Sequence, residues 1–231
     1  MPKILYIESA TSICSVVLAE DEKIISFRES EATNSHSELL TDFIYQILKE
    51  NSLEVTDLDA VAVSKGPGSY TGLRIGVSAA KGLCYSSNIP LLAVDTLSSM
   101  AYGAKSLHND SDYIFCPMID ARRMEVYTAL YDSDMNIISD IEAKIIDENS
   151  FQEILSNQKI LFFGDGMSKC KNTIISSNAI FDDNYIISAK SLIKPDLEKF
   201  NNKDFEDIAY FEPFYLKDFI AGKPSVKALY D

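Results

Sequence analysis

Several residue types that often carry chemistry are scarce or missing in this chain of 231 residues. Tryptophan is absent, and there are only two histidines and four cysteines. The cysteines lie far apart and form no CxxC pair, which argues against a zinc site and against a disulfide framework. We therefore expect a cytoplasmic protein that binds no metal. Its four cysteines should be reduced thiols: Cys14, Cys84, Cys116 and Cys170.

Basic residues and long apolar runs are also few. Lys and Arg number 21 against 35 Asp and Glu, which gives a formal net charge of −14. Affinity for nucleic acid rests mainly on neutralising phosphates with Lys and Arg, so we expect any contact with RNA to go through a partner. No apolar run approaches the roughly 20 residues of a membrane span, and residues 1–4 show no signal-peptide pattern. We expect no membrane association.

The apolar residues that are present, 46% of the chain, suffice for a core and follow an α/β pattern. In the first half, Ser35 and Glu38 form a capping box ahead of an apolar helical stripe that ends at Leu48. The expected strands of this half are 3–7, 13–19, 24–28, 60–63 and 91–94, and its expected helices begin at 35, 72 and 96.

The same plan restarts near residue 112. Here we expect strands at 114–119, 125–131 and 159–163, a third strand from Met135, a helix at 149–155 and another after Gly166. Glu8 then corresponds to Asp120, and the triplet 66–68 to the triplet 164–166. The alternative is coincidence among ordinary α/β segments, but a carboxylate that ends the first strand of both halves favours duplication.

A duplication of this kind predicts two lobes, residues 1–110 and 111–231, each a mixed sheet flanked by helices. That is the actin-like (ASKHA, ribonuclease H-like) architecture, in which a nucleotide lies between the lobes. Strand-end carboxylates there hold Mg²⁺ through water, and hairpin N–H groups hold phosphates.

The segment 64–76, SKGPGSYTGLRIG, runs from an apolar strand through a Gly-rich loop into a helix. Such a loop turns tightly, and the new helix offers N–H groups and a positive dipole end to an anion. The alternative is a structural turn that needs glycine only for its backbone angles. The candidate nucleotide-binding residues, in a weak or vestigial site, are Glu8, Thr11, Ser12, Gly66, Gly68, Ser69 and Thr71.

Two features predict that a nucleotide binds weakly. The Glu8 carboxylate reaches about 1.5 Å further into the cleft than an aspartate would. The second hairpin carries Arg122, Arg123 and Met124, which are too bulky to admit a phosphate closely. We therefore expect no tightly bound cofactor. Asp120, Arg122, Arg123 and Glu125 are either an acid/base set or an ion-pair cluster at the lobe junction, and the sequence leaves both open.

Two motifs, GPGSYTGLRIG at 66–76 and IDARRMEVY at 119–127, make the chain resemble the TsaB (YeaZ) family. The resemblance covers residues 3 to about 217 and is loose from 140 to 205. It implies a non-catalytic subunit that pairs with the paralogue TsaD and the ATPase TsaE to form N6-threonylcarbamoyladenosine beside the anticodon of ANN-decoding tRNAs. It also implies that ATP or ADP binds only at the complex with the partner subunits. Glu8 stands where the family usually has Asp, so a nucleotide role there is in doubt.

The resemblance further implies that two helices pair with those of TsaD, or of a second copy when TsaD is absent. The residues that carry this prediction are His36, Leu40, Ile44, Leu48, Gly72, Leu73, Arg74, Gly76, Val77, Ala80 and Cys84. The spacing of Gly72, Gly76 and Ala80 leaves one helix face nearly bare, and a bulky residue at Gly76 should abolish pairing without unfolding the chain. The alternative for this surface is packing within the chain.

Other functions are weighed against this one. A stand-alone ASKHA-type kinase or ATPase needs two working phosphate hairpins. A metalloprotease or glycoprotease needs more than His36, which has Leu40 rather than a second histidine four residues on. We therefore expect no intrinsic catalysis. Whether the free chain is a monomer or a homodimer, and whether residues 217–231 are ordered, stays open.

Overall fold

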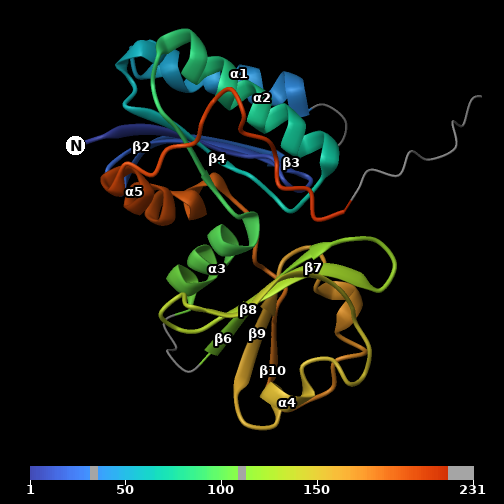
Figure 1. The fold of residues 1–231 in the computed structure, drawn as a ribbon. Coiled ribbons are helices and arrows are strands. Elements are labelled where there is room, and N and C mark those ends of the chain that lie inside the picture. Colours follow the sequence, from blue (N-terminus) through green and yellow to red (C-terminus); the bar gives the residue numbers. More distant parts are fainter. Residues whose placement is uncertain (32–35, 109–112, 218–231) are drawn as a thin grey trace, which may run out of the picture.

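The chain folds into two stacked lobes, each built on a five-stranded mixed sheet (Figure 1). The computed structural model describes residues 1–31, 36–108 and 113–217. The first sheet contains β1 (Lys3–Glu8), β2 (Ile13–Glu20), β3 (Lys23–Glu31), β4 (Ala60–Ser64) and β5 (Leu91–Val94). The second contains β6 (Tyr113–Asp120), β7 (Glu125–Tyr131), β8 (Ile137–Ile145), β9 (Lys159–Phe163) and β10 (Ala179–Asp182).

The two sheets have the same topology, which confirms the predicted duplication. The strand order is β3-β2-β1-β4-β5 in the first lobe and β8-β7-β6-β9-β10 in the second. In each lobe the strand that comes first in the chain, β1 or β6, lies in the centre of the sheet. It pairs antiparallel with the second strand and parallel with the fourth in both lobes. The equivalence of Glu8 with Asp120 follows, because each residue ends the central strand of its sheet.

Helices cover both faces of the first sheet. The pair α1 (His36–Glu50) and α2 (Tyr70–Ser87) lies side by side on one face, with Leu40, Ile47 and Val77 in the core beneath. On the other face, a 3-10 turn (Ala189–Leu192) and α5 (Ile193–Asn202) pack on the opposite side chains of the same strands. No helix in the described part of the chain is both long and apolar enough to cross a membrane.

The second sheet has less helical cover. α3 (Thr96–Leu107) packs on its upper face, and its side chains share a core with Phe115, Leu161 and Phe163. The other face is covered by α4 (Gln152–Leu155) and by a 3-10 turn (Ser168–Cys170), around a core that includes Phe162. A further 3-10 turn (Val55–Asp57) precedes β4 in the first lobe.

The predictions for the second half needed corrections at five elements. The helix expected after Gly166 is only a 3-10 turn, and the helix expected at 149–155 is the single turn α4. The third strand begins at Ile137 rather than Met135, because Asp132 accepts backbone N–H bonds from residues 134 and 136 that hold a turn there. β10 and α5 were not predicted at all.

The missed helix α5 carries a signal that was present in the sequence. Ile193, Leu197 and Phe200 recur at the spacing of one helix face, and all three pack on the first sheet. Pro195 lies in the first turn, where its missing N–H breaks no helical bond. The range 111–231 expected for the second lobe therefore contains a segment that returns to the first. The capping residue Ser35 lies outside the described residues.

Two glycines let α2 approach the turn after β1 at backbone distance. A Cβ built on Gly72 would lie 2.0 Å from the Ser9 carbonyl oxygen, and one on Gly76 would lie 2.2 Å from Ser9 Oγ. The Ser9 hydroxyl in turn donates a hydrogen bond of 2.9 Å to the Gly72 carbonyl. The expectation that Gly76 leaves a bare face for a partner is therefore wrong, because the chain's own turn occupies that face.

This contact predicts opposite effects for the same substitution at two glycines of α2. Gly72→Ala should destabilise the fold by about 1–3 kcal/mol, since the methyl group has no room against Ser9. Gly82→Ala should stabilise it by roughly 1 kcal/mol, since a Cβ there meets nothing within 4 Å and alanine favours the helix. Urea unfolding followed by circular dichroism measures both. Equal effects at the two positions would contradict the close approach.

Candidate functional site

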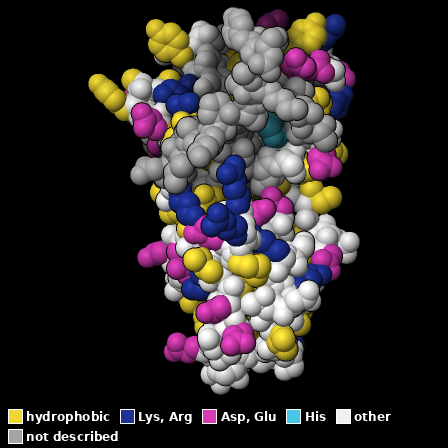
Figure 2. All heavy atoms as spheres, turned by 90° about the vertical axis from the view of Figure 1, so that its right-hand side faces the viewer, with side chains coloured by type: hydrophobic (Ala, Val, Ile, Leu, Met, Phe, Trp, Pro, Cys, Tyr) yellow, Lys and Arg dark blue, Asp and Glu magenta, His cyan; other side chains and the backbone are white. Residues whose placement is uncertain are grey.

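A cleft of about 660 Å³ lies between the two lobes and collects five of the seven candidate nucleotide-binding residues. Thr11, Ser12, Gly68, Ser69 and Thr71 line it from the first lobe. The hairpin between β6 and β7, Asp165 and residues 214–217 of the C-terminal segment complete the walls. Figure 2 shows several Lys and Arg side chains gathered across one face where the lobes meet. Glu8 and Gly66 do not line the cleft.

Four N–H groups of the turn after β1 and of the Gly-rich loop are bonded within the chain. In the turn after β1, Ala10 N donates to Glu8 Oε1 at 2.7 Å and Ile13 N donates to Thr11 Oγ1 at 3.3 Å. In the Gly-rich loop, Gly66 N donates to Thr96 Oγ1 and Ser69 N donates to the Ala10 carbonyl at 2.6 Å. Each of these donors would have to break a bond before it could bind an anion.

Glu8 is fully buried, contrary to the expectation that its carboxylate reaches into the cleft. Its Oε1 turns back on Ala10 N, and its Oε2 has no hydrogen-bond partner among the described residues. Burial raises the pKa of Glu8 to about 7, and the Ala10 N–H and the nearby Ser64 hydroxyl lower it only in part.

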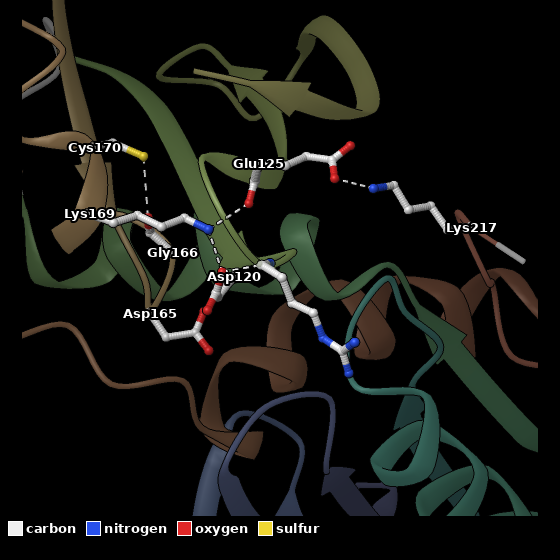
Figure 3. A network of polar contacts seen from close by, with 8 residues as sticks. Asp120, Glu125, Asp165, Gly166, Lys169, Cys170 and Lys217 are labelled. Carbon is white, nitrogen blue, oxygen red and sulfur yellow. Dashed lines mark hydrogen bonds and ion pairs between the residues drawn. The ribbon is translucent and has the colours of Figure 1, made fainter. Parts of the chain in front are cut away.

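In the second lobe the strand-end carboxylate Asp120 is paired rather than free. Figure 3 shows Lys169 between the Asp120 carboxylate, with which it forms an ion pair, and the Glu125 carbonyl at 2.6 Å. Burial alone would raise the pKa of Asp120, but the Lys169 ammonium and the Arg122 N–H outweigh it and lower that pKa. Asp165 accepts a 3.0 Å bond from Asp120 N, and burial raises its pKa.

This geometry supports the ion-pair interpretation of the cluster that the sequence left open. Asp120 and Glu125 are held by Lys169 and Lys217 respectively. Arg122 and Arg123 both have positive φ, 71° and 51°, and are exposed at the tip of the hairpin. Glycine, asparagine and aspartate tolerate such angles better than arginine. The residue that sequence reasoning missed is Lys169, whose ion pair is visible only once β6 and the segment after β9 lie together.

A C-terminal strap, residues 211–217, runs along the first lobe and crosses to the second. Phe214 N donates to the Lys65 carbonyl at 2.7 Å, and Lys81 Nζ donates to the Phe211 carbonyl at 2.7 Å. The Tyr215 ring lies 4.8 Å from the Tyr70 ring. At the end of the strap, Lys217 forms an ion pair with Glu125. The strap thereby joins the Gly-rich loop, α2 and the second lobe.

Most of the residues predicted to contact a partner are buried inside the first lobe, which corrects that prediction for direct contact. They form the inner faces of α1 and α2 and cannot reach a partner unless the lobe opens. The buried residues are Leu40, Ile44, Leu48, Gly72, Leu73, Gly76, Val77, Ala80 and Cys84. The apolar stripe indicates which face of a helix is buried, and here the sheet buries it.

Arg74 and His36 are the two predicted interface residues outside this core. Arg74 is exposed on α2, where its guanidinium lies 4.7 Å from the Tyr70 ring. His36 lines the interlobe cleft instead of the outer surface of the helices. Among the described residues, no three His, Cys, Asp or Glu side chains lie close enough together to hold a metal ion.

The outer surface of α1 and α2 carries exposed aromatic side chains that the sequence analysis did not select. Tyr45 on α1 is 60% exposed, and Tyr85 on α2 is 81% exposed. Gly82 lies on the same exposed surface of α2, one turn before Ser86, with open space beside it. These residues occupy helix positions outside the apolar stripe. The sequence could have indicated them as the face of each helix that the stripe does not bury.

Comparison with known proteins gives a consistent result. A family model described as "TsaD: tRNA N6-adenosine threonylcarbamoyltransferase" matches residues 29–221. The tRNA threonylcarbamoyladenosine biosynthesis protein TsaB of Escherichia coli (strain K12) is 29% identical over 230 residues, 96% of this chain and 97% of that protein. The protein of that name from Bacillus subtilis (strain 168) is 32% identical over 177 residues, 74% of each.

A solved structure agrees with the fold. The structure "YeaZ from Pseudomonas aeruginosa" superposes with a TM-score of 0.82 at 22% sequence identity, over 94% of this chain and all of that chain. At this level of identity the likeness supports the shared two-lobed fold and nothing further.

The buried Glu8 predicts a pH dependence of stability. Its pKa in the folded chain, about 7, lies above the ordinary value of 4.5. Glu8 therefore stabilises the fold fully below about pH 4.5, and this contribution of about 3 kcal/mol is lost as the pH rises to about 7. Glu8→Gln keeps an oxygen for Ala10 N and carries no charge, so its stability relative to wild type should rise over that interval.

Urea unfolding of wild type and Glu8→Gln at pH 4.5 and pH 8 measures the effect. Glu22→Gln is the control, because Glu22 is exposed in the turn after β2. If Glu8→Gln shows the same stability difference from wild type at both pH values, the carboxyl does not change its ionisation as described.

Proposed function

The chain belongs to the TsaB family, and from that premise we propose that it acts in tRNA threonylcarbamoyladenosine biosynthesis as a non-catalytic partner subunit of TsaD. In this proposal it is the platform on which TsaD, with the ATPase TsaE, transfers the threonylcarbamoyl group to adenosine beside the anticodon. The observation that carries the proposal is family membership, together with the internal hydrogen bonds that the N–H groups of Ala10, Gly66 and Ser69 already make beside the cleft.

The competing function, a stand-alone kinase or ATPase of the actin-like class, has less support from the cleft. Phosphate binding between the lobes relies on free N–H groups in two hairpins and on a strand-end carboxylate near the metal. Here Glu8 is buried away from the cleft, and Asp120 is bound to Lys169. ATP or ADP is therefore proposed to bind only where this chain and its partners meet.

The outer surface of α1 and α2 is proposed as the platform surface. It presents Tyr45 and Tyr85, and tyrosine is enriched in the centres of protein interfaces. Gly82 lies open on the same surface, so a partner helix can approach α2 there at close range. Two copies of the chain would use the same surface when TsaD is absent.

The charge of the chain fits an indirect contact with RNA. With a net charge of −14 the chain repels phosphate overall, so tRNA is proposed to bind through the complex and not through this subunit alone. All four cysteines are buried free thiols, as a protein of the cytoplasm would have. A cytoplasmic location of this chain is part of the proposal.

The platform surface predicts the effect of one bulky side chain. Gly82→Arg should abolish co-elution of the chain with its cognate TsaD on size exclusion, because the side chain fills the open space on α2. The fold should be kept, since arginine favours a helix by about 0.5–1 kcal/mol over glycine. Asn201→Arg, on the exposed side of α5, is the matched control and should co-elute normally.

Thermal unfolding of the free variants checks that both remain folded. A Gly82→Arg chain that is folded and still co-elutes with TsaD would place the interface elsewhere. Failure of the wild-type chain to form any complex with TsaD, with or without nucleotide, would remove the platform function itself.

The cleft predicts the nucleotide affinity of the isolated chain. Titration calorimetry with Mg-ATP should show no saturable binding at micromolar concentrations, because Ala10, Gly66 and Ser69 already donate their N–H groups within the chain. The same titration of the complex with TsaD is the positive control. A micromolar dissociation constant for the isolated chain would favour the kinase or ATPase alternative.

A further inference from the structure

A second groove lies on the edge of the second lobe and meets the cleft at Phe214, which lines both. It has a volume of about 590 Å³ and runs between strand β8 and the C-terminal strap. Ile137 and Ile141 line it from β8, and Phe211, Pro213 and Phe214 line it from the strap. The floor is therefore apolar and is contributed by both lobes.

One wall of the groove is the free edge of a sheet. β8 is the last strand in the order β10-β9-β6-β7-β8, so no described strand pairs with its outer side. An edge strand presents backbone N–H and C=O groups to any extended segment that lies beside it. β8 is nine residues long and carries exposed isoleucines between its charged residues, with Ile137 64% exposed, Ile138 46% exposed and Ile145 71% exposed.

Proteins usually protect such an edge, and the first lobe shows how. The equivalent edge strand β3 carries Lys23 and Arg28, and the Lys190 ammonium lies 3.6 Å from the centre of the exposed Phe27 ring. On β8 the lysine Lys144 is bound to Glu142 of the same strand and lies over the Phe151 ring. The apolar edge of β8 beside the groove has no such cover among the described residues.

The groove is acidic as well as apolar. Four carboxylates line it, from Asp95, Asp140, Glu206 and Glu212, and two of them have a cation: Glu206 lies 3.7 Å from the Lys199 ammonium, and Lys65 lines the groove itself. Lys65 is already 3.7 Å from Asp95. No described lysine or arginine forms an ion pair with Asp140 or Glu212, which are both exposed. The ligand that satisfies this lining must bring positive charge.

We propose that this groove binds an extended, lysine- or arginine-bearing segment of a partner protein, which adds as a strand to the edge of β8. Backbone hydrogen bonds to β8 would supply affinity, and alternate side chains would fill the apolar floor or face the carboxylates. The partner approaches a chain of net charge −14, so its positive charge also speeds the encounter.

A second copy of this chain fits the edge poorly. In antiparallel β8–β8 pairs centred on Ile141 or on Glu142, Asp140 would lie opposite Glu142 or Glu142 opposite its own copy, and like charges directly opposite each other are destabilising. A pair centred on Ala143 would place Glu142 opposite Lys144, but Asp140 would then face Ile146 and gain no cation. The unpaired carboxylates of the groove therefore favour a basic segment of a different protein.

The test uses the full chain and a short fluorescent peptide in which valine and lysine alternate. The peptide should bind saturably, and the affinity should fall as salt is raised. The double variant Asp140→Lys with Glu212→Lys should weaken binding by about tenfold or more. Glu153→Lys, an exposed carboxylate on α4 away from the groove, is the matched control and should bind as wild type does.

Hydrogen exchange locates the bound peptide. In the free chain at low concentration the outer amides of β8 should exchange quickly, and the peptide should slow them while leaving those of β3 unchanged. Equal binding to the double variant and to wild type, or no binding, overturns the proposal. So does slow exchange of the β8 edge in the free chain, because the edge is then already covered by the chain itself or by a second copy.

Discussion

The close contact between a Gly-rich segment and the end of the central strand is the constraint on which both lobes depend. In the first lobe Gly72 and Gly76 of α2 lie against Ser9, with no space for a side chain. In the second lobe a Cβ on Gly164 would lie 2.4 Å from the Met118 carbonyl oxygen, and Gly166 N bonds to that same carbonyl. Close approach of this kind fixes how the helix or turn after the fourth strand is seated on the sheet.

The same contact underlies the proposal that the interlobe cleft of the isolated chain binds nucleotide weakly. When the loop and the turn lie this close, their N–H groups bond to each other and to neighbouring oxygens, as Ser69 N does to the Ala10 carbonyl. The carboxylates at the strand ends are withdrawn in different ways: Glu8 is buried beneath its own turn, and Asp120 is neutralised by Lys169.

A chain built in this way offers surfaces for partners more readily than a site for chemistry. The outer side of α1 and α2 is proposed to receive TsaD, and the edge of β8 with the strap is proposed to receive a basic segment. The strap connects the two regions physically, since Lys81 of α2 binds the carbonyl of Phe211, and Phe211 lines the groove. The acidic character of the whole chain favours basic protein partners over direct contact with RNA.

The sequence by itself determined the duplication, most strands of the central sheets and the residues that meet at the cleft. These follow from local patterns: alternating or continuous apolar runs, glycine spacing and carboxylates at strand ends. It also identified the apolar faces of α1 and α2, but it could not say what covers them. Leu40 and Val77 look the same in sequence whether a sheet or a partner buries them, because both remove them from water in the same way.

Only the tertiary structure decided which groups bind each other across the chain. The ion pair of Lys169 with Asp120 joins residues 49 positions apart, and α5 packs on the first lobe although it follows all strands of the second sheet in the chain. The direction of the Glu8 side chain was decided by burial, which favours its neutral form and its bond to Ala10. Contacts of this range depend on how the two lobes pack, and no local pattern of residues encodes them.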